Sequence, residues 1–294
     1  MQLRITSSVG KGGKNIANDV KVVRALLNVY MRQQSSAGKL KIEAKNNSEL
    51  EEAIFSFQKL YLKVSEPDSR IDPNGRSFRG LKQVLSSVFK PLGVSEPSYG
   101  AVTWSSEGAE GGPYHSRKLH VPSFSSGLTI GRGYDMKTKT SAKIYADLIA
   151  CGVASNKAEV LKKAESLKGS EAQKFICEHD LLDFQISPDG QKKLFKISYD
   201  LEEADVKRIC AKKDVVLKYG KTDWDSLNSR IKDVVVDLKF RGDYTGSSRK
   251  LIQKAIADNN LDEFKKAMID KSNWSSVPED RFKRRKKFLE TKSK

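Results

Sequence analysis

The sequence predicts a mainly α (α+β) protein, in which a three-helix module precedes a larger helical domain that carries one small β-hairpin lobe. Apolar residues recur at helical spacing through most of the 294 residues. Residues 126–135 instead alternate small and bulky side chains, and residues 90–100 contain two prolines and two glycines. We therefore expect domains at residues 1–90 and 101–294, joined by a linker at residues 91–100.

Three helices are predicted in the first domain. One follows Asp19, a second starts at Ser48 with Glu51 completing a capping box, and a third follows the turn at residues 72–75. The apolar positions expected to be buried on these helices are Val20, Val23, Leu26, Leu27, Tyr30, Leu50, Ile54, Phe57, Leu60, Phe78, Leu81, Leu85 and Val88.

The second domain is predicted to become helical after the hairpin. Ser141 and Ser155 are each expected to begin a helix, and Pro188 to occupy the first turn of another. Residues 200–203 offer a further capping box. The most apolar helix is expected to carry residues 231–238 and to form the buried centre of this domain.

The hairpin and the acidic residue before it suggest glycosidase chemistry. Glu107 stands where an apolar segment stops, while Thr129 and Asp135 place a hydroxyl and a second carboxylate on the hairpin. A glycosidase needs one carboxyl group that protonates the leaving oxygen, and a second polar group that holds a water on the opposite sugar face. Spacing alone does not separate Glu107 from Glu110 as the acid; a position at a helix end favours Glu107.

These residues also carry a family resemblance. Glu107-Gly108, Tyr114 and the run from Ser126 to Asp135 together resemble the active-site signature of phage-type lysozymes, most closely the pesticin-like branch. The resemblance implies that Glu107 is the general acid and that Thr129 and Asp135 complete the site. One departure concerns Ser116, because the better-known phage enzymes have an aspartate at that position.

The resemblance covers residues 101–290 and implies a lysozyme-like domain. In the first domain, an ordered set of short motifs is similar to the peptidoglycan-binding modules of bacterial wall hydrolases and interbacterial toxins: Ser8-Val9-Gly10, Asn15, Asp19-Val20, Leu26-Leu27-Asn28, Ala53-Ile54, Phe57-Gln58 and residues 67–76. Both resemblances imply a peptidoglycan muramidase that hydrolyses the β-1,4 bond between N-acetylmuramic acid and N-acetylglucosamine. If Asp135 acts through a water, the two carboxyl groups should lie roughly 6.5–9.5 Å apart and the product anomer should be inverted.

Several further residues are candidates for the substrate groove. They are Tyr114, Arg117, His120, Arg132 and Tyr134. His115 and His120 invite a metal site, but no third ligand has suitable spacing, so we expect no metal and no organic cofactor. The three cysteines are far apart and are expected to be plain thiols.

The composition bounds the partners and the location. The net charge of +17 favours polyanionic partners such as the bacterial envelope. The basic run at residues 281–288 is expected to be a solvated or envelope-binding face, and the absence of aromatic-basic interleaving argues against nucleic acid. We expect a monomer with no membrane span and no signal peptide, made in the cytoplasm and acting on the wall of target bacteria after specialised secretion.

We therefore expect an antibacterial effector or toxin, whose partners are an immunity protein and a component of the secretion machine. The alternative is a non-catalytic peptidoglycan-binding or adaptor protein with a lysozyme fold. A basic nucleic-acid-binding protein is a third hypothesis.

Overall fold

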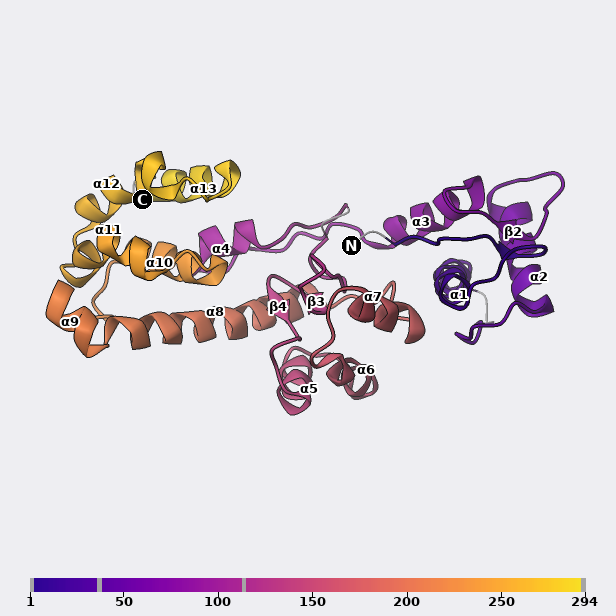
Figure 1. Ribbon diagram of the computed structural model, residues 1–294, viewed down its shortest axis with the longest axis horizontal. Helices are drawn as coiled ribbons and strands as arrows, with labels where there is room; N and C mark the ends of the chain where they lie inside the picture. Colours follow the sequence, from indigo (N-terminus) through magenta and orange to yellow (C-terminus); the bar gives the residue numbers. More distant parts are fainter. Residues whose placement is uncertain (1–2, 36–38, 113–114, 292–294) are drawn as a thin grey trace. The chain divides into compact units, whose positions relative to one another are not determined.

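A computed structural model describes residues 3–35, 39–112 and 115–291. Over these ranges the chain is mainly helical with two small antiparallel sheets (Figure 1), which confirms the predicted fold class. Strand β1 (Val9–Gly10) pairs with β2 (Arg70–Ile71), and β3 (Thr129–Ile130) pairs with β4 (Tyr134–Asp135). Within the described ranges, no helix combines the length and the apolar character needed to cross a bilayer.

The chain divides into two compact units. The first unit contains residues 1–93 and 109–194, and the second contains residues 94–108 and 195–294. The boundary therefore falls inside the long helix α8 (Pro188–Cys210). The predicted domain division at residues 91–100 stays a prediction.

The first unit begins with the three predicted helices and a short π-helix. They are α1 (Ala17–Gln33), α2 (Ser48–Ser56), the π-helix η1 (Phe57–Tyr61) and α3 (Arg76–Val88). Helix α1 packs against α3, and Leu26, Leu27 and Ile54 are fully buried as predicted. Two local predictions were wrong. Asn47 rather than Ser48 caps α2, accepting the N–H of Leu50, and Leu60 is 61% exposed.

The exposure of Leu60 has a structural cause. After α2 the backbone bonds run from residue i to i+5, so that the N–H of Leu62 donates to the carbonyl of Phe57 at 3.2 Å. This wider turn breaks the 3.6-residue repeat on which the prediction rested. Phe57 stays in the core, and Leu60 turns outward.

The remainder of the first unit is helical after the β3–β4 hairpin. Its elements are α5 (Ser141–Ala150), α6 (Ser155–Leu161), the 3-10 turn η2 (Lys162–Ala164), α7 (Gly169–Glu178) and the beginning of α8. Thr140 rather than Ser141 caps α5, accepting the N–H of Lys143. Helix α7 packs against α1, and Arg32 pairs beyond it with Asp180 at 2.7 Å.

The second unit is built around α10. Its elements are α4 (Ala101–Ser106), the rest of α8, α9 (Lys213–Tyr219), α10 (Ser229–Arg241), α11 (Gly246–Ala257), α12 (Leu261–Ile269), the 3-10 turn η3 (Lys271–Trp274) and α13 (Glu279–Glu290). Ile231, Val234 and Leu238 are fully buried, which confirms α10 as the apolar centre. The predicted capping box at residues 200–203 was wrong, because α8 runs through it without a break.

Candidate active site

Glu107 lies directly after α4, a helix of six residues. Its N–H donates to the carbonyl of Thr103 at 2.9 Å, so its backbone closes the last turn. Trp104 is buried, and its ring meets Phe195 edge-on with centroids 5.1 Å apart. This contact anchors α4 to the core of the second unit and gives Glu107 a defined place beside it.

The beginning of α4 is held by the half-buried carboxylate of Asp233. Gly100 has a φ of 64°, and its N–H donates to Oδ1 of Asp233 at 2.9 Å. The hydroxyl of Tyr199 donates to the same oxygen at 2.8 Å. A side chain at Gly100 would place Cβ 2.6 Å from the Tyr199 ring, so the position requires glycine. Burial raises the pKa of Asp233, and these hydrogen bonds oppose burial only in part.

The Glu107 carboxylate pairs with Arg281 on α13. Nη1 of Arg281 donates to Oε1 at 2.7 Å, and the Glu107 side chain is 22% exposed. The other oxygen, Oε2, makes no hydrogen bond within the described part of this unit. The described residues of this unit therefore fix the carboxylate through one oxygen, and none of them bonds to the other.

Arg281 belongs to a buried network on α10 and α13. Its Nη2 donates to Asp237 at 2.6 Å, and Nε of Arg285 donates to the second oxygen of Asp237 at 2.6 Å. Asp237 has no exposed surface. Burial lowers the pKa of Arg281, but the carboxylates of Asp237 and Glu107 outweigh burial and raise it above its ordinary value. Its charge is shared between two carboxylates.

Thr129 and Asp135 face each other across the β3–β4 hairpin. The Asp135 carboxylate accepts two main-chain N–H bonds, from Gly127 at 3.1 Å and from Lys137 at 2.8 Å. The Thr129 hydroxyl donates to the carbonyl of Gly127 at 3.2 Å. The hairpin thus brings the predicted hydroxyl and carboxylate together and holds both through its own backbone.

Glycines make this hairpin possible. A Cβ at Gly127 would lie 2.2 Å from Oδ1 of Asp135, so any larger residue would displace the carboxylate. Gly131 and Gly133 form the turn with φ of 64° and 84°, values that L side chains rarely adopt. Arg132 lies between them and is buried.

Tyr134 connects the hairpin to helix α5. Its ring is fully buried, and its hydroxyl donates to Asp147 on α5 at 2.8 Å. Burial and the neighbouring Asp147 raise the pKa of Tyr134. Its described contacts are structural, and its predicted contact with substrate stays a prediction.

Glu110, the rival acid, lies in a different environment in the first unit. Nε of Arg117 donates to Oε2 at 3.0 Å, and Gln191 donates to Oε1 at 2.9 Å. Gln191 also accepts a hydrogen bond from Ser116 at 2.5 Å. Arg117 is buried and donates further to the carbonyl of Ile186. Both Glu110 oxygens therefore accept hydrogen bonds, whereas only Oε1 of Glu107 accepts one from the described residues of its unit.

Of the two histidines of this region, His115 lies beside this network, with Nδ1 3.7 Å from Oε2 of Glu110. His115 is buried; it accepts the N–H of Gly111 at 2.8 Å, and its ring stacks on Phe89. His120 joins the hairpin through backbone bonds to Thr129 in both directions. Burial lowers the pKa of both imidazoles. Tyr114 lies outside the described residues.

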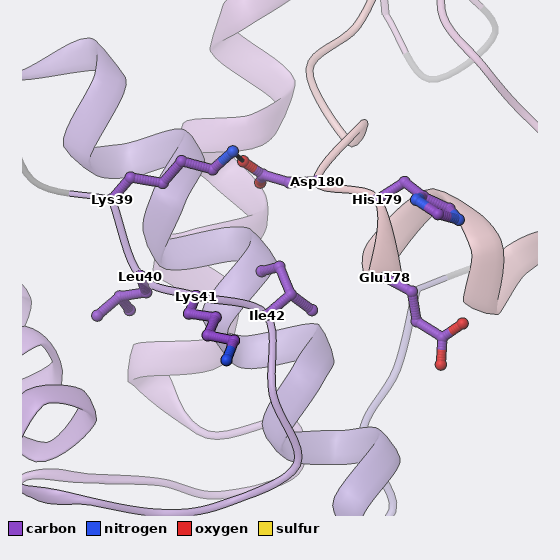
Figure 2. Close-up of a pocket in the computed structure, with 7 residues that line it drawn as sticks. All are labelled: Lys39, Leu40, Lys41, Ile42, Glu178, His179 and Asp180. Carbon is purple, nitrogen blue, oxygen red and sulfur yellow. Dashed lines mark ion pairs between the residues drawn. The ribbon is translucent and has the colours of Figure 1, made fainter. Parts of the chain in front are cut away.

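A polar cavity of about 430 Å³ in the first unit contains none of the predicted site residues (Figure 2). It is lined by Lys39, Leu40, Lys41, Ile42, Glu178, His179 and Asp180. Burial raises the pKa of Asp180, but Arg32 and Lys39 outweigh burial and hold it below its usual range. Because these ion pairs already use the carboxylate, the cavity is not our candidate site.

The structure therefore assembles two groups of candidate residues, one in each unit. Thr129 and Asp135 lie together in the first unit, and Glu107 lies with Arg281 in the second. The sequence reasoning missed Arg281, Arg285 and Asp237. Arginines four residues apart share a helix face, and that face also carries Phe282 and Leu289; this spacing could have indicated that both are buried.

Comparison with known proteins finds one family profile that spans most of the residues described above. A family profile described as "Domain of unknown function (DUF8812)" matches residues 100–286. The match includes Glu107, Thr129, Asp135 and Arg281, and begins after the three N-terminal helices. Comparison with curated proteins gives no match. Since the profile covers more than half of the chain, the protein belongs to the DUF8812 family.

Proposed function

We propose that the protein is a peptidoglycan muramidase that hydrolyses the β-1,4 bond between N-acetylmuramic acid and N-acetylglucosamine. Glu107 protonates the leaving oxygen, and Asp135, with Thr129, positions the attacking water. The observation that carries the proposal is the Glu107 carboxylate, which is fixed by Arg281 through one oxygen while the other makes no hydrogen bond within the described part of its unit. A general acid requires such a directed and accessible oxygen.

Pairing with Arg281 is compatible with an acid role for Glu107, because Arg281 shares its charge between two carboxylates. Arg281 donates to Asp237 as well as to Glu107, so Glu107 does not receive the whole of the guanidinium charge. The pairing also restricts the carboxylate to one orientation. Positioning of this kind is a large part of enzymatic rate enhancement.

On the hairpin, Asp135 is held as a water-binding group would need to be. Its two backbone hydrogen bonds set the orientation of the carboxylate and leave further lone pairs for a water. Attack by that water predicts inversion at the anomeric carbon. The anomer of the fresh product, followed by NMR, tests this part, and a retained anomer would contradict it.

The resemblances also suggest a setting, which we propose as part of the same reading. The protein would be an antibacterial effector that acts on the wall of target bacteria after specialised secretion, with residues 1–90 as its peptidoglycan-binding module. An immunity protein and a component of the secretion machine would be its partners. Removing residues 1–90 should weaken action on intact sacculi more than on short soluble fragments.

A second candidate function is a non-catalytic peptidoglycan-binding or adaptor protein. The hydrogen bonds of Thr129 and Asp135 are compatible with it, because bonds to Gly127 and Lys137 also suit residues that only stabilise the hairpin. An adaptor would bind sacculi without releasing fragments.

The deciding experiment is mass spectrometry of the muropeptides released from purified sacculi. The unaltered protein should release fragments that end in reducing muramic acid. Glu107→Gln should release at least about a thousandfold less, while Glu110→Gln, the matched control beside another arginine, should retain activity. Loss in Glu110→Gln alone would move the acid to Glu110. Absence of product from all three proteins would leave the adaptor.

A further inference from the structure

A cavity of about 340 Å³ lies in the first unit, far in sequence from the predicted catalytic residues. It is lined by α1 and by the continuous segment of α2 and η1. The lining residues are Tyr30, Met31, Gln34, Ala53, Ser56, Leu60 and Tyr61. Its volume is that of a small-ligand pocket rather than of a packing defect.

Aromatic rings make one part of the lining rigid. The Tyr61 ring stacks on Phe57 with centroids 5.2 Å apart and meets Tyr30 edge-on at 5.7 Å. Phe57 is fully buried, whereas Tyr61 is 38% exposed. The core therefore holds the Tyr61 ring in one orientation and leaves part of it accessible from solvent.

The π-helix η1 places Leu60 and Tyr61 at the cavity. Its i→i+5 bonding places Leu60, 61% exposed, and Tyr61 at the cavity while Phe57 stays in the core. Single-turn π-helices are rare and occur often at functional sites. An exposed leucine beside an exposed tyrosine also leaves apolar surface that folding alone does not bury.

Two polar side chains of the lining have no hydrogen-bond partner among the described residues. Neither the Gln34 amide nor the Ser56 hydroxyl makes a hydrogen bond to any residue that the structure describes. The lining also contains no charged residue, although 31% of the chain is charged and its net charge is +17. The lining therefore lacks the positive charge that the chain as a whole carries.

We propose that this cavity binds a neutral N-acetylated sugar, an N-acetylhexosamine unit. A pyranose ring has an apolar C–H face that can lie on Tyr61, and polar edges that can bond to Gln34 and Ser56. Its acetamido methyl suits the apolar side chains of Met31, Ala53 and Leu60. A purely aliphatic ligand would leave the amide and the hydroxyl unpaired, which costs binding free energy.

The inference deepens the proposed function, since such sugars make up the wall glycan, but it does not depend on hydrolysis. The test is an NMR titration of the full chain carrying Glu107→Gln, which removes turnover, with N-acetylglucosamine and its β-1,4-linked oligomers. The lining amides should shift, with a Kd on the order of 1 mM for the monosaccharide. Glucosamine, which is cationic and lacks the acetyl group, should bind at least about tenfold more weakly.

Two variants and a matched control locate the site. Tyr61→Ala should weaken binding about tenfold, and Gln34→Ala, an exposed change that the fold tolerates, about fivefold. Phe55→Ala should have no effect, because Phe55 is 43% exposed on the same helix but does not line the cavity. Shifts confined to residues around Glu107 and Thr129, or equal effects of Phe55→Ala and Tyr61→Ala, would overturn the proposal. Failure of the muramidase assay would not.

Discussion

The two units hold their candidate carboxylates in different ways. In the second unit, Glu107 is positioned by Arg281, which is itself held by Asp237 on another helix. In the first unit, Asp135 is positioned by the N–H groups of Gly127 and Lys137, both within eight residues of it. One carboxylate depends on packed side chains distant in sequence, and the other depends on a local turn.

The two carboxylates should therefore be displaced by different kinds of substitution. The Glu107 arrangement requires that α4, α10 and α13 pack together, so it is as stable as the core of the second unit. The Asp135 arrangement requires only the hairpin backbone and glycine at one position. Changes far from Glu107 should therefore affect it, whereas only nearby changes should affect Asp135.

The largest expected effect comes from Asp237→Asn. Removing one partner of a buried pair leaves Arg281 and Arg285 without their shared charge, at a cost of about 3–5 kcal/mol in the free energy of unfolding. Trp104, Trp224 and Trp274 all lie in the second unit, so urea unfolding followed by tryptophan fluorescence reports on it. Asp135→Asn is the control and should leave this transition unchanged. A cost below about 1 kcal/mol would contradict the importance of the network.

The next effect belongs to the hairpin. Gly127→Ala would place Cβ 2.2 Å from Asp135 and 2.4 Å from the side chain of Lys137, which should cost about 1–3 kcal/mol locally. Amide hydrogen exchange in a peptide covering residues 127–137 should then be about 5–150 times faster. Gly93→Ala is the matched control, because no atom lies within 4 Å of its Cβ position. Unchanged exchange in Gly127→Ala would show that the hairpin adapts.

A smaller effect should follow acidification through the range in which histidines titrate, and it should arise in the first unit. Burial lowers the pKa of His115, His120 and His179, the three histidines of the chain, and all lie in that unit. The unfolded chain, with an ordinary histidine pKa of about 6.5, then binds more protons than the folded chain. The stability that the neutral histidines contribute is complete above that pH and is lost as pH falls through the folded pKa values. NMR titration of the imidazoles measures this, and midpoints above 6.5 would contradict it.

The smallest effect is expected from Arg284→Ala. Arg284 belongs to the same basic run as Arg281 and Arg285, but its pair with Asp280 is exposed on both sides. Such pairs contribute about 0–1 kcal/mol. Arg285→Ala should cost several times more, because Arg285 is buried against Asp237. Urea unfolding followed by tryptophan fluorescence measures the free energy of unfolding of both variants. Equal losses would contradict the expectation that the buried arginine of this helix contributes more than the exposed one.

Much of the hairpin could be predicted from the sequence because its determinants are local. The glycines and the alternation of small and bulky residues indicate a tight hairpin, whereas the pairing of Thr129 with Asp135 was found only in the structure. The core of α10 was equally accessible, since apolar residues at helical spacing report burial directly.

Other features depended on packing that no local pattern encodes. Capping residues were misplaced by one position at α2 and α5, because adjacent polar residues compete for the same N–H groups. The potential cap at residues 200–203 lost to the continuous burial of one face of α8. Leu60 turned outward when the π-helix changed the repeat.

The sequence by itself determined the helical class, the hairpin and the residue types able to perform glycosidase chemistry. Only the tertiary structure decided that the basic C-terminal helix turns two arginines inward, and that Arg281 meets Glu107 across a separation of 174 residues. Spacing along the chain cannot indicate this, because an ion pair between distant helices forms only when their packing brings the two charges within reach and removes them from water.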